Sequence, residues 1–262
     1  MTPYQAMFSA RFRSLLQYRA AAIAGFCTQI FWGLIRMMIF SAFYAGVQEP
    51  MPMDLRQVIA YVWLGQAFFT MIPLRPDRDV EGLIRSGNVA YEMLRPVDQY
   101  NLWYSRAIAT CLAPMSLRAV PILLISLVAG WLYWPGWLPL AGCAVSMLAA
   151  ALLSAAFCTL LTITMFWTIS GRGIMVIASI LAYTLSGIMI PLPFFPDSMQ
   201  WLLNALPFRG LIDVPFRICT GSIAAGQVPM EIASQLAWTA VLVLAGRMLL
   251  ARSVRRVVVQ GG

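Results

Sequence analysis

Six apolar runs, each about as long as a membrane-crossing segment, most strongly limit the folds open to this chain. A helix needs roughly 20 mainly apolar residues to cross the hydrocarbon core of a bilayer. The predicted spans are residues 20–47, 55–73, 108–130, 138–168, 173–191 and 230–251. With 61% hydrophobic and 11% charged residues, a chain of 262 residues cannot cover a soluble globular surface. We therefore predict an all-α polytopic membrane protein with a single domain over residues 1–262.

The positions of the arginines predict the topology. All eighteen basic residues are arginines, and most of them flank the apolar runs instead of clustering with aromatic residues. This distribution argues against a nucleic-acid surface. A cytoplasmic N-terminus puts thirteen of the arginines on the cytoplasmic side, as the positive-inside rule favours. Both termini are therefore predicted to be cytoplasmic.

The first 19 residues predict a helix that lies on the membrane surface. Phe8, Phe12, Leu15 and Leu16 recur at helical spacing in a segment that is otherwise polar and arginine-rich. Such an amphipathic helix lies in the interface with its apolar face toward the lipid.

Residues 192–228 predict a re-entrant segment at the outer face. Asp197 is expected to cap a short helix that Pro207 ends. The segment is too apolar for a free aqueous loop, so we expect it to fold back and be buried against protein. Whether Cys143 pairs with Cys219 near this face stays open, because spacing along a sequence does not fix the approach of two thiols.

Nine charged residues between positions 75 and 98 interrupt the apolar pattern and define a cytoplasmic segment over residues 74–99. The segment predicts a short helix with Asp77 or Asp79 as its N-cap and Gly87 as a left-handed C-terminal cap. Acidic side chains in its first turn support this assignment, because negative charges are favourable near the N-terminus of a helix. Val80, Leu83 and Ile84 form one apolar stripe along this helix. Since two helical turns are not stable alone in water, the stripe requires a surface, either the lipid interface or a groove on another protein.

Two arginines fall inside predicted spans, where a charge is costly and usually turned inward. Arg36 shares a helical face with Gln29, Trp32 and Phe40, which gives the first span a polar seam. Either a substrate contact in a water-lined cavity or a structural hydrogen bond explains such a residue.

Arg118 lies between Pro114 and Pro121, whose freed carbonyls are expected to accept its hydrogen bonds. The same two interpretations, substrate contact or structural hydrogen bond, apply to it. Weaker candidates complete the predicted substrate path: Gln66, Phe69, Tyr183 and Ser186.

Two parts of the chain resemble the ABC-2 type permeases, a family of bacterial membrane proteins with six spans. The first is EGLIRSG at residues 81–87 followed by MLRPV at residues 93–97. The second runs over residues 186–208, with SG at 186–187, Pro191, FP at 195–196 and LPF at 206–208. The motifs cover about a fifth of the chain, and the resemblance in topology covers all of it.

The resemblance implies the membrane subunit of an ABC exporter in the bacterial cytoplasmic membrane. Two permease chains, identical or related, would work with two ATPase chains that hold ATP and magnesium. The cytoplasmic helix would then be the coupling helix that docks in an ATPase groove. Its expected contact residues are Asp79, Val80, Glu81, Leu83, Ile84 and Arg85.

The residue types leave few alternatives. The chain contains no lysine and no histidine, which excludes a phosphate-loop lysine and a histidine metal ligand or general base. We therefore expect no enzyme activity and no cofactor in this chain. The expected substrate is amphipathic or drug-like, with a lipid or a glycan as alternatives. An ion-coupled secondary transporter is a weaker alternative, because no span has an acidic residue near its centre.

Overall fold

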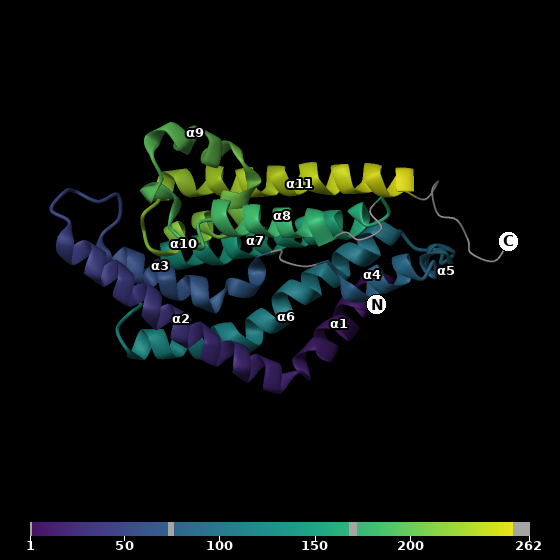
Figure 1. Cartoon of the computed structure of the whole chain (residues 1–262), viewed down its shortest axis with the longest axis horizontal. Coiled ribbons are helices and arrows are strands. Elements are labelled where there is room, and N and C mark those ends of the chain that lie inside the picture. Colours follow the sequence, from purple (N-terminus) through teal and green to yellow (C-terminus); the bar gives the residue numbers. More distant parts are fainter. Residues whose placement is uncertain (1, 73–75, 168–171, 254–262) are drawn as a thin grey trace.

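The computed structural model describes residues 2–72, 76–167 and 172–253. Within these ranges every regular element is helical, so the predicted all-α class is confirmed. Four helices are long and apolar enough to cross a membrane, and they run broadly along the long axis of the molecule (Figure 1). They are α2 (Arg19–Gly46), α6 (Gln99–Val128), α7 (Trp137–Thr164) and α11 (Val228–Ser253).

Shorter helices precede and connect these four. They are α1 (Pro3–Leu16), α3 (Leu55–Ala67), α4 (Arg78–Arg85), α5 (Val89–Met93), α8 (Arg172–Leu185), α9 (Asp197–Ala205) and α10 (Asp213–Cys219). Four 3-10 turns complete the described elements: η1 (Phe69–Met71), η2 (Leu192–Phe194), η3 (Pro207–Leu211) and η4 (Ala225–Gln227).

The second and fifth predicted spans form helices that are shorter than the sequence indicated. α3 has 13 residues and α8 has 14. At 1.5 Å per residue each rises about 20 Å, which is less than the roughly 30 Å of a hydrocarbon core. α3 is apolar because the bundle encloses it, and Trp63 within it is completely buried. An apolar run alone does not distinguish a helix buried in protein from a helix that crosses a membrane.

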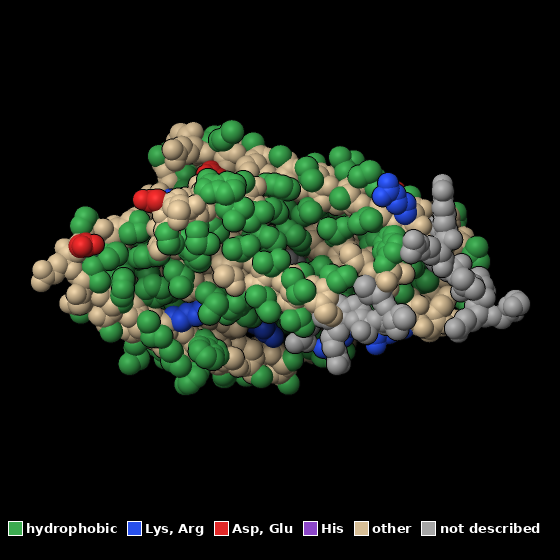
Figure 2. Space-filling view, turned by 45° about the horizontal axis from the view of Figure 1, so that its top comes forward, with side chains coloured by type: hydrophobic (Ala, Val, Ile, Leu, Met, Phe, Trp, Pro, Cys, Tyr) green, Lys and Arg blue, Asp and Glu red, His purple; other side chains and the backbone are tan. Residues whose placement is uncertain are grey.

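Large apolar side chains cover the outside of the long helices. Hydrophobic side chains predominate over the face in Figure 2. α2 exposes Ile23, Phe31 and Met38, and α11 exposes Leu244 and Met248. Water does not stabilise an exposed apolar surface of this extent, whereas lipid covers it without cost. The exposed surface and the long apolar helices together indicate a multi-pass membrane protein.

α1 forms as predicted, and its half-buried face lies against α6. Its start is fixed by a capping box, in which Thr2 accepts the amide of Gln5 and the Gln5 side chain accepts the amide of Thr2. Phe8 and Phe12 stack at 5.6 Å between ring centroids. Part of the apolar face that was predicted to meet lipid therefore packs on protein. The contact of α1 with a membrane surface stays a prediction.

The segment that was predicted to lie at the outer face, residues 192–228, folds back onto the bundle, with α10 packed against α7 and α3. Asp197 is the first residue of α9 and not its cap, because Pro196 occupies the capping position. A carboxylate in the first helical turn is nevertheless favourable. Cys143 and Cys219 are free thiols that pack in one cluster between α7 and α10.

Small residues bring α7 close to its neighbours. Ala150 and Ser154 of α7 are completely buried, and small side chains of this kind let membrane helices approach closely. Gln235 of α11 links three elements, because its Nε2 donates to the carbonyls of Gly210 at 2.7 Å and Ser146 at 3.2 Å. The Ser146 hydroxyl donates back to Gln235 Oε1 at 2.9 Å.

Candidate functional site

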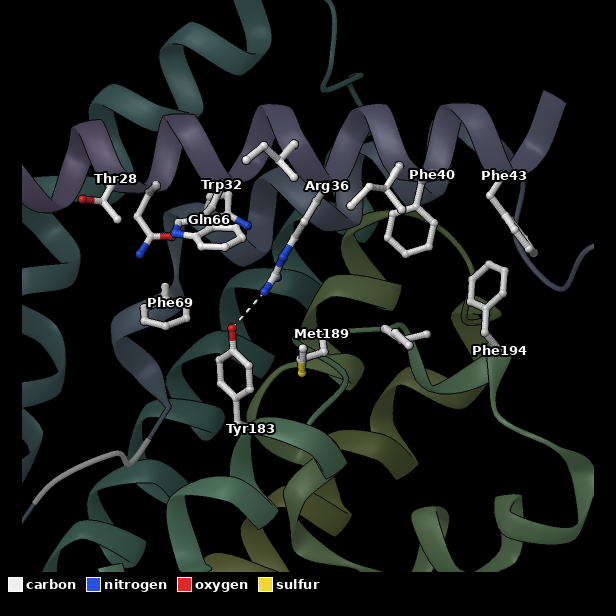
Figure 3. Close-up of a pocket in the computed structure, with 14 residues that line it drawn as sticks. Thr28, Trp32, Arg36, Phe40, Phe43, Gln66, Phe69, Tyr183, Met189 and Phe194 are labelled. Atoms are coloured by element: carbon white, nitrogen blue, oxygen red, sulfur yellow. Dashed lines mark hydrogen bonds between the residues drawn. The ribbon is translucent and has the colours of Figure 1, made fainter. Parts of the chain in front are cut away.

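A pocket of about 730 Å³ opens between α2, α3, α8 and the segment that follows α8 (Figure 3). It brings together five of the seven residues predicted for a substrate path: Gln29, Arg36, Gln66, Phe69 and Tyr183. The other lining residues are Thr28, Trp32, Ile35, Ile39, Phe40, Phe43, Met189, Ile190 and Phe194. The contact of these residues with a substrate stays a prediction.

Helical spacing explains why α2 supplies one whole wall of the pocket. Gln29, Trp32, Arg36, Phe40 and Phe43 are three or four positions apart, so their side chains lie on one face of the helix. Figure 3 shows Trp32, Arg36, Phe40 and Phe43 following one another along α2. The polar seam predicted for the first span is therefore a pocket wall.

Arg36 points from α2 across the pocket toward α8 (Figure 3). Its Nη2 donates to the hydroxyl of Tyr183 at 2.9 Å, and its Nη1 donates to the carbonyl of Ile188 at 2.7 Å. Both acceptors are neutral. Among the described residues no carboxylate forms an ion pair with Arg36. The positive charge in this pocket is therefore not neutralised by the described part of the chain.

Gln66 of α3 lies beside the same wall, and only 2% of its surface is exposed. Its Nε2 has no hydrogen-bond acceptor among the described residues. Gly33 allows this approach of α2 to α3, because a Cβ atom there would stand 2.8 Å from the Trp63 ring and 3.0 Å from Gln66 Cγ. A buried amide donor without an acceptor is costly.

Arg118 and Ser186 do not line the pocket. Arg118 Nη2 donates to the carbonyl of Ala21 on α2 at 3.2 Å, and its guanidinium packs over Gly25. The carbonyls near its flanking prolines, which the sequence favoured as acceptors, are not its partners in the described contacts. A structural role for Arg118 therefore fits better than a substrate contact. Ser186 is completely buried, and its carbonyl accepts the amide of Asp213 at 3.0 Å.

Sequence reasoning missed Asp213, which holds the segment after α8 in place. The Asp213 side chain is completely buried, and its Oδ1 accepts the hydroxyl of Tyr61 at 3.2 Å and the amide of Leu192 at 3.3 Å. Gly187, at φ +88°, makes the turn after α8, since a left-handed residue is strained with any side chain. In a sequence, an acidic residue outside the apolar runs resembles a solvated loop residue. Only the position of Asp213, two residues before Pro215, indicated a helix start.

The segment that was predicted to be cytoplasmic is fixed at its base by two carboxylates. Asp77 caps α4, because its Oδ1 accepts the amides of Asp79 at 2.9 Å and Val80 at 3.3 Å. Asp77 also pairs with Arg106 of α6, with Arg106 Nε 3.2 Å from Asp77 Oδ2. Asp79 accepts from Arg106 at 2.9 Å and from Arg11 of α1 at 2.7 Å. The start of α4 is therefore tied to both α6 and α1.

The apolar stripe of α4 is turned toward the chain itself and not outward. Val80 is completely buried in a cluster with Trp103 and Ile163, and Leu83 and Ile84 pack against the same cluster. Leu83 and Ile84 are only half-buried, however, so the contact of this stripe with a partner groove stays a prediction. The stripe already has an apolar surface, which the ends of α6, α7 and α11 provide.

A different apolar pair faces outward beside α4. Tyr91 of α5 is 66% exposed, and Leu94 directly after α5 is 80% exposed. Arg95, which follows Leu94 directly in the chain, is also exposed. Glu81 forms an ion pair with Arg85 at 2.7 Å along the outer side of α4. The exposed surface of this segment thus includes a small apolar patch beside Arg95.

A family model described as ABC-2 family transporter protein matches residues 30–261. This range includes the pocket wall of α2 from Trp32 onward, the cytoplasmic segment and the outer segment. No curated protein and no solved structure matches the chain. The resemblance seen in the cytoplasmic and outer motifs is confirmed, and the chain belongs to the ABC-2 family of membrane transport proteins.

Proposed function

We propose that this chain is the permease subunit of an ATP-driven ABC exporter and that it forms the path for an amphipathic or drug-like substrate. The match to the ABC-2 family over residues 30–261 is the observation that carries the proposal. The pocket adds support, because its aromatic walls and few polar groups are typical of sites for small amphipathic molecules. A glycan would need more hydrogen-bonding groups than this lining offers.

The pocket also argues against an ion-coupled carrier. No aspartate or glutamate is among the described residues that line it. Proton- and sodium-coupled carriers generally place such acids on their pathways. Energy must then come from elsewhere, and a separate ATPase chain that binds ATP and magnesium is the source that family membership favours.

The cytoplasmic segment is suited to transmit movement from such an ATPase. Force applied to α4 passes through Asp77 and Asp79 to Arg106 of α6 and Arg11 of α1. The buried stripe of α4 adds an apolar attachment to the same helices. We propose that the ATPase binds the outward patch around Tyr91 and Leu94 together with the charged outer side of α4.

Copurification tests this docking surface. Leu94→Asp should leave the permease folded, because Leu94 is 80% exposed, and should reduce the amount of ATPase that copurifies. Ala10→Asp is the matched control, since it adds the same charge to an exposed position on α1 away from the patch. Leu83→Asp should instead destabilise the permease itself, because Leu83 packs on its own core. Wild-type ATPase stoichiometry in the Leu94→Asp complex would show that the patch is not the docking surface.

A further inference from the structure

Two side chains that line the pocket carry hydrogen-bond donors without partners in the described contacts. Arg36 carries a positive charge that only a phenol and a backbone carbonyl contact. Two hydrogen bonds leave three of the five guanidinium N–H groups without a partner in the described contacts. Gln66 adds a buried amide donor without an acceptor among the described residues. A group with several negatively charged oxygens would satisfy both residues.

The position of Arg36 strengthens this interpretation. It lies in the interior of α2, inside an apolar helix long enough to cross a membrane. A charged side chain at such a depth is unfavourable unless a partner or water compensates it. No carboxylate of the described chain does so, and an oxyanion from a ligand would supply charge-assisted hydrogen bonds in a site of low polarity.

The rest of the pocket is built for an apolar body. The rings of Trp32, Phe40, Phe43, Phe69 and Phe194 line it, and the ring of Phe194 lies 6.2 Å from that of Phe40. Figure 3 shows the labelled aromatic side chains on both sides of Arg36, with Phe40 and Phe43 toward one end and Phe69 toward the other. An apolar chain attached to the charged group can therefore lie along α2.

The mouth of the pocket is also apolar. Ile39, Phe43, Met189 and Ile190 line the pocket and are exposed on the surface of the chain. These residues belong to α2 and to the turn after α8, at the level of the membrane-crossing helices. A ligand that is already dissolved in the bilayer can enter by this route without crossing water.

We infer that the pocket binds an anionic amphiphile, with a phosphate or carboxylate group against Arg36 and Gln66 and an apolar chain along the aromatic wall of α2. The binding itself rests on the pocket, whereas export of the bound molecule rests on the proposed function. The anionic group can belong to a bilayer phospholipid or to a free single-chain amphiphile.

Photolabelling of the full-length chain in phosphatidylcholine nanodiscs tests this inference. The probe is a long-chain fatty acid that carries a diazirine, and its methyl ester and the corresponding amine are the controls. We expect the carboxylate probe to label peptides of α2 and of residues 186–194, with dodecyl phosphate as a competitor. Equal labelling of this site by the ester or the amine would overturn the inference.

Three substitutions separate binding from structure. Arg36→Gln removes the charge and keeps an N–H donor on a shorter side chain, and it should weaken probe binding about tenfold to a hundredfold. Arg36→Lys should recover much of this loss. Arg118→Gln is the matched control, because it removes a span arginine outside the pocket and should leave binding unchanged. An equal loss in the Arg36→Gln and Arg118→Gln chains would refute a specific charge contact.

Gln66→Leu distinguishes a ligand contact from a purely structural role through two measurements, the thermal unfolding midpoint and probe binding. It removes a buried donor that has no acceptor in the described part of the chain, so the thermal unfolding midpoint without ligand should not fall. Probe binding should nevertheless weaken about two- to tenfold. A lower midpoint together with unchanged binding would contradict the role assigned to Gln66.

Competition experiments distinguish two sources of the ligand, and a transport assay separates binding from export. Competition by phosphatidylglycerol added to the nanodiscs would identify a bilayer lipid as the occupant. Competition by dodecyl phosphate alone would identify a single-chain amphiphile. Either result supports the anionic site, and competition by neither overturns it. Charge-dependent labelling in a chain that exports nothing with its ATPase would refute the proposed function and leave the binding inference intact.

Discussion

The Asp77 carboxylate stabilises α4 in two ways, as a helix cap and as a partner of Arg106. Two different substitutions of Asp77 separate these contributions. The carboxylate caps the helix by accepting the amides of Asp79 and Val80. It also pairs with Arg106, and the two side chains are only 9% and 10% exposed. Asp77→Asn keeps the cap and removes the charge, since asparagine caps helices as well as aspartate does. Asp77→Ala removes both.

The geometry sets the expected magnitudes. Asp77→Asn should cost about 1.5–3 kcal/mol, the range for a hydrogen bond to a charged group. It should not reach the larger penalty of an unpaired buried charge, because Arg106 keeps Asp79 at 2.9 Å. Asp77→Ala adds the loss of the cap, about 1 kcal/mol. The two substitutions should therefore differ by about the value of the cap.

Hydrogen–deuterium exchange of peptides that cover residues 76–86 measures the opening of α4 directly. Since about 1.4 kcal/mol corresponds to a tenfold change in an equilibrium, protection should fall about tenfold to a hundredfold in Asp77→Asn. In Asp77→Ala it should fall about fivefold further.

Asp98→Asn is the matched control, because Asp98 caps α6 through Asn101 and pairs with Arg247 at 3.0 Å. That pair is 37–42% exposed and should contribute about 1 kcal/mol or less. Equal losses of protection at the two aspartates would refute the view that burial makes the Asp77 pair strong. Identical exchange in Asp77→Asn and Asp77→Ala would refute the capping role.

Three further predictions concern the membrane part and the whole chain. Gly187→Ala should lower the thermal unfolding midpoint of the purified protein, because Gly187 has a φ of +88° and a new Cβ there would stand 2.5 Å from the Tyr61 hydroxyl. An unchanged midpoint would contradict the turn geometry. Gln235→Leu should destabilise the chain by about 1–3 kcal/mol, since it leaves the Gly210 carbonyl and the Ser146 hydroxyl without their partner. Denaturant unfolding measures this loss, and a difference below about 0.5 kcal/mol would count against it. The purified chain alone should hydrolyse no ATP, because it has no lysine for a phosphate-binding loop; a phosphate-release assay on the isolated chain would detect any exception.

The candidate site was largely predictable on α2 and much less so elsewhere. A helix has a fixed period, so the side chains near Arg36 could be assigned to one face from their spacing alone. Gln66 and Tyr183 were weaker candidates, because their meeting with Arg36 depends on how α3 and α8 pack against α2. Asp213 gave no clear signal, since its partners lie far away in the sequence.

In the cytoplasmic segment, too, local features were predictable from the sequence and packing was not. Its charges and turn residues predicted a capped helix that ends at Gly87, and the structure has Asp77 as the N-cap and Gly87 at φ +75°. Those features depend on a few neighbouring residues. The direction in which Val80, Leu83 and Ile84 face depends on which elements pack beside the helix. That packing cannot be read from the sequence of the segment.

The sequence by itself determined the membrane class, the all-helical fold and the local start and end of α4, because each follows from composition, period or short-range hydrogen bonding. The family was indicated by the resemblance of its motifs. Only the tertiary structure decided that α3 is enclosed by protein, that the stripe of α4 packs on its own chain, and that Arg36 and Gln66 share one pocket. Those features arise from contacts between helices that are distant in the sequence. An apolar side chain is equally compatible with lipid, with a partner and with the core of its own chain until its neighbours are in place.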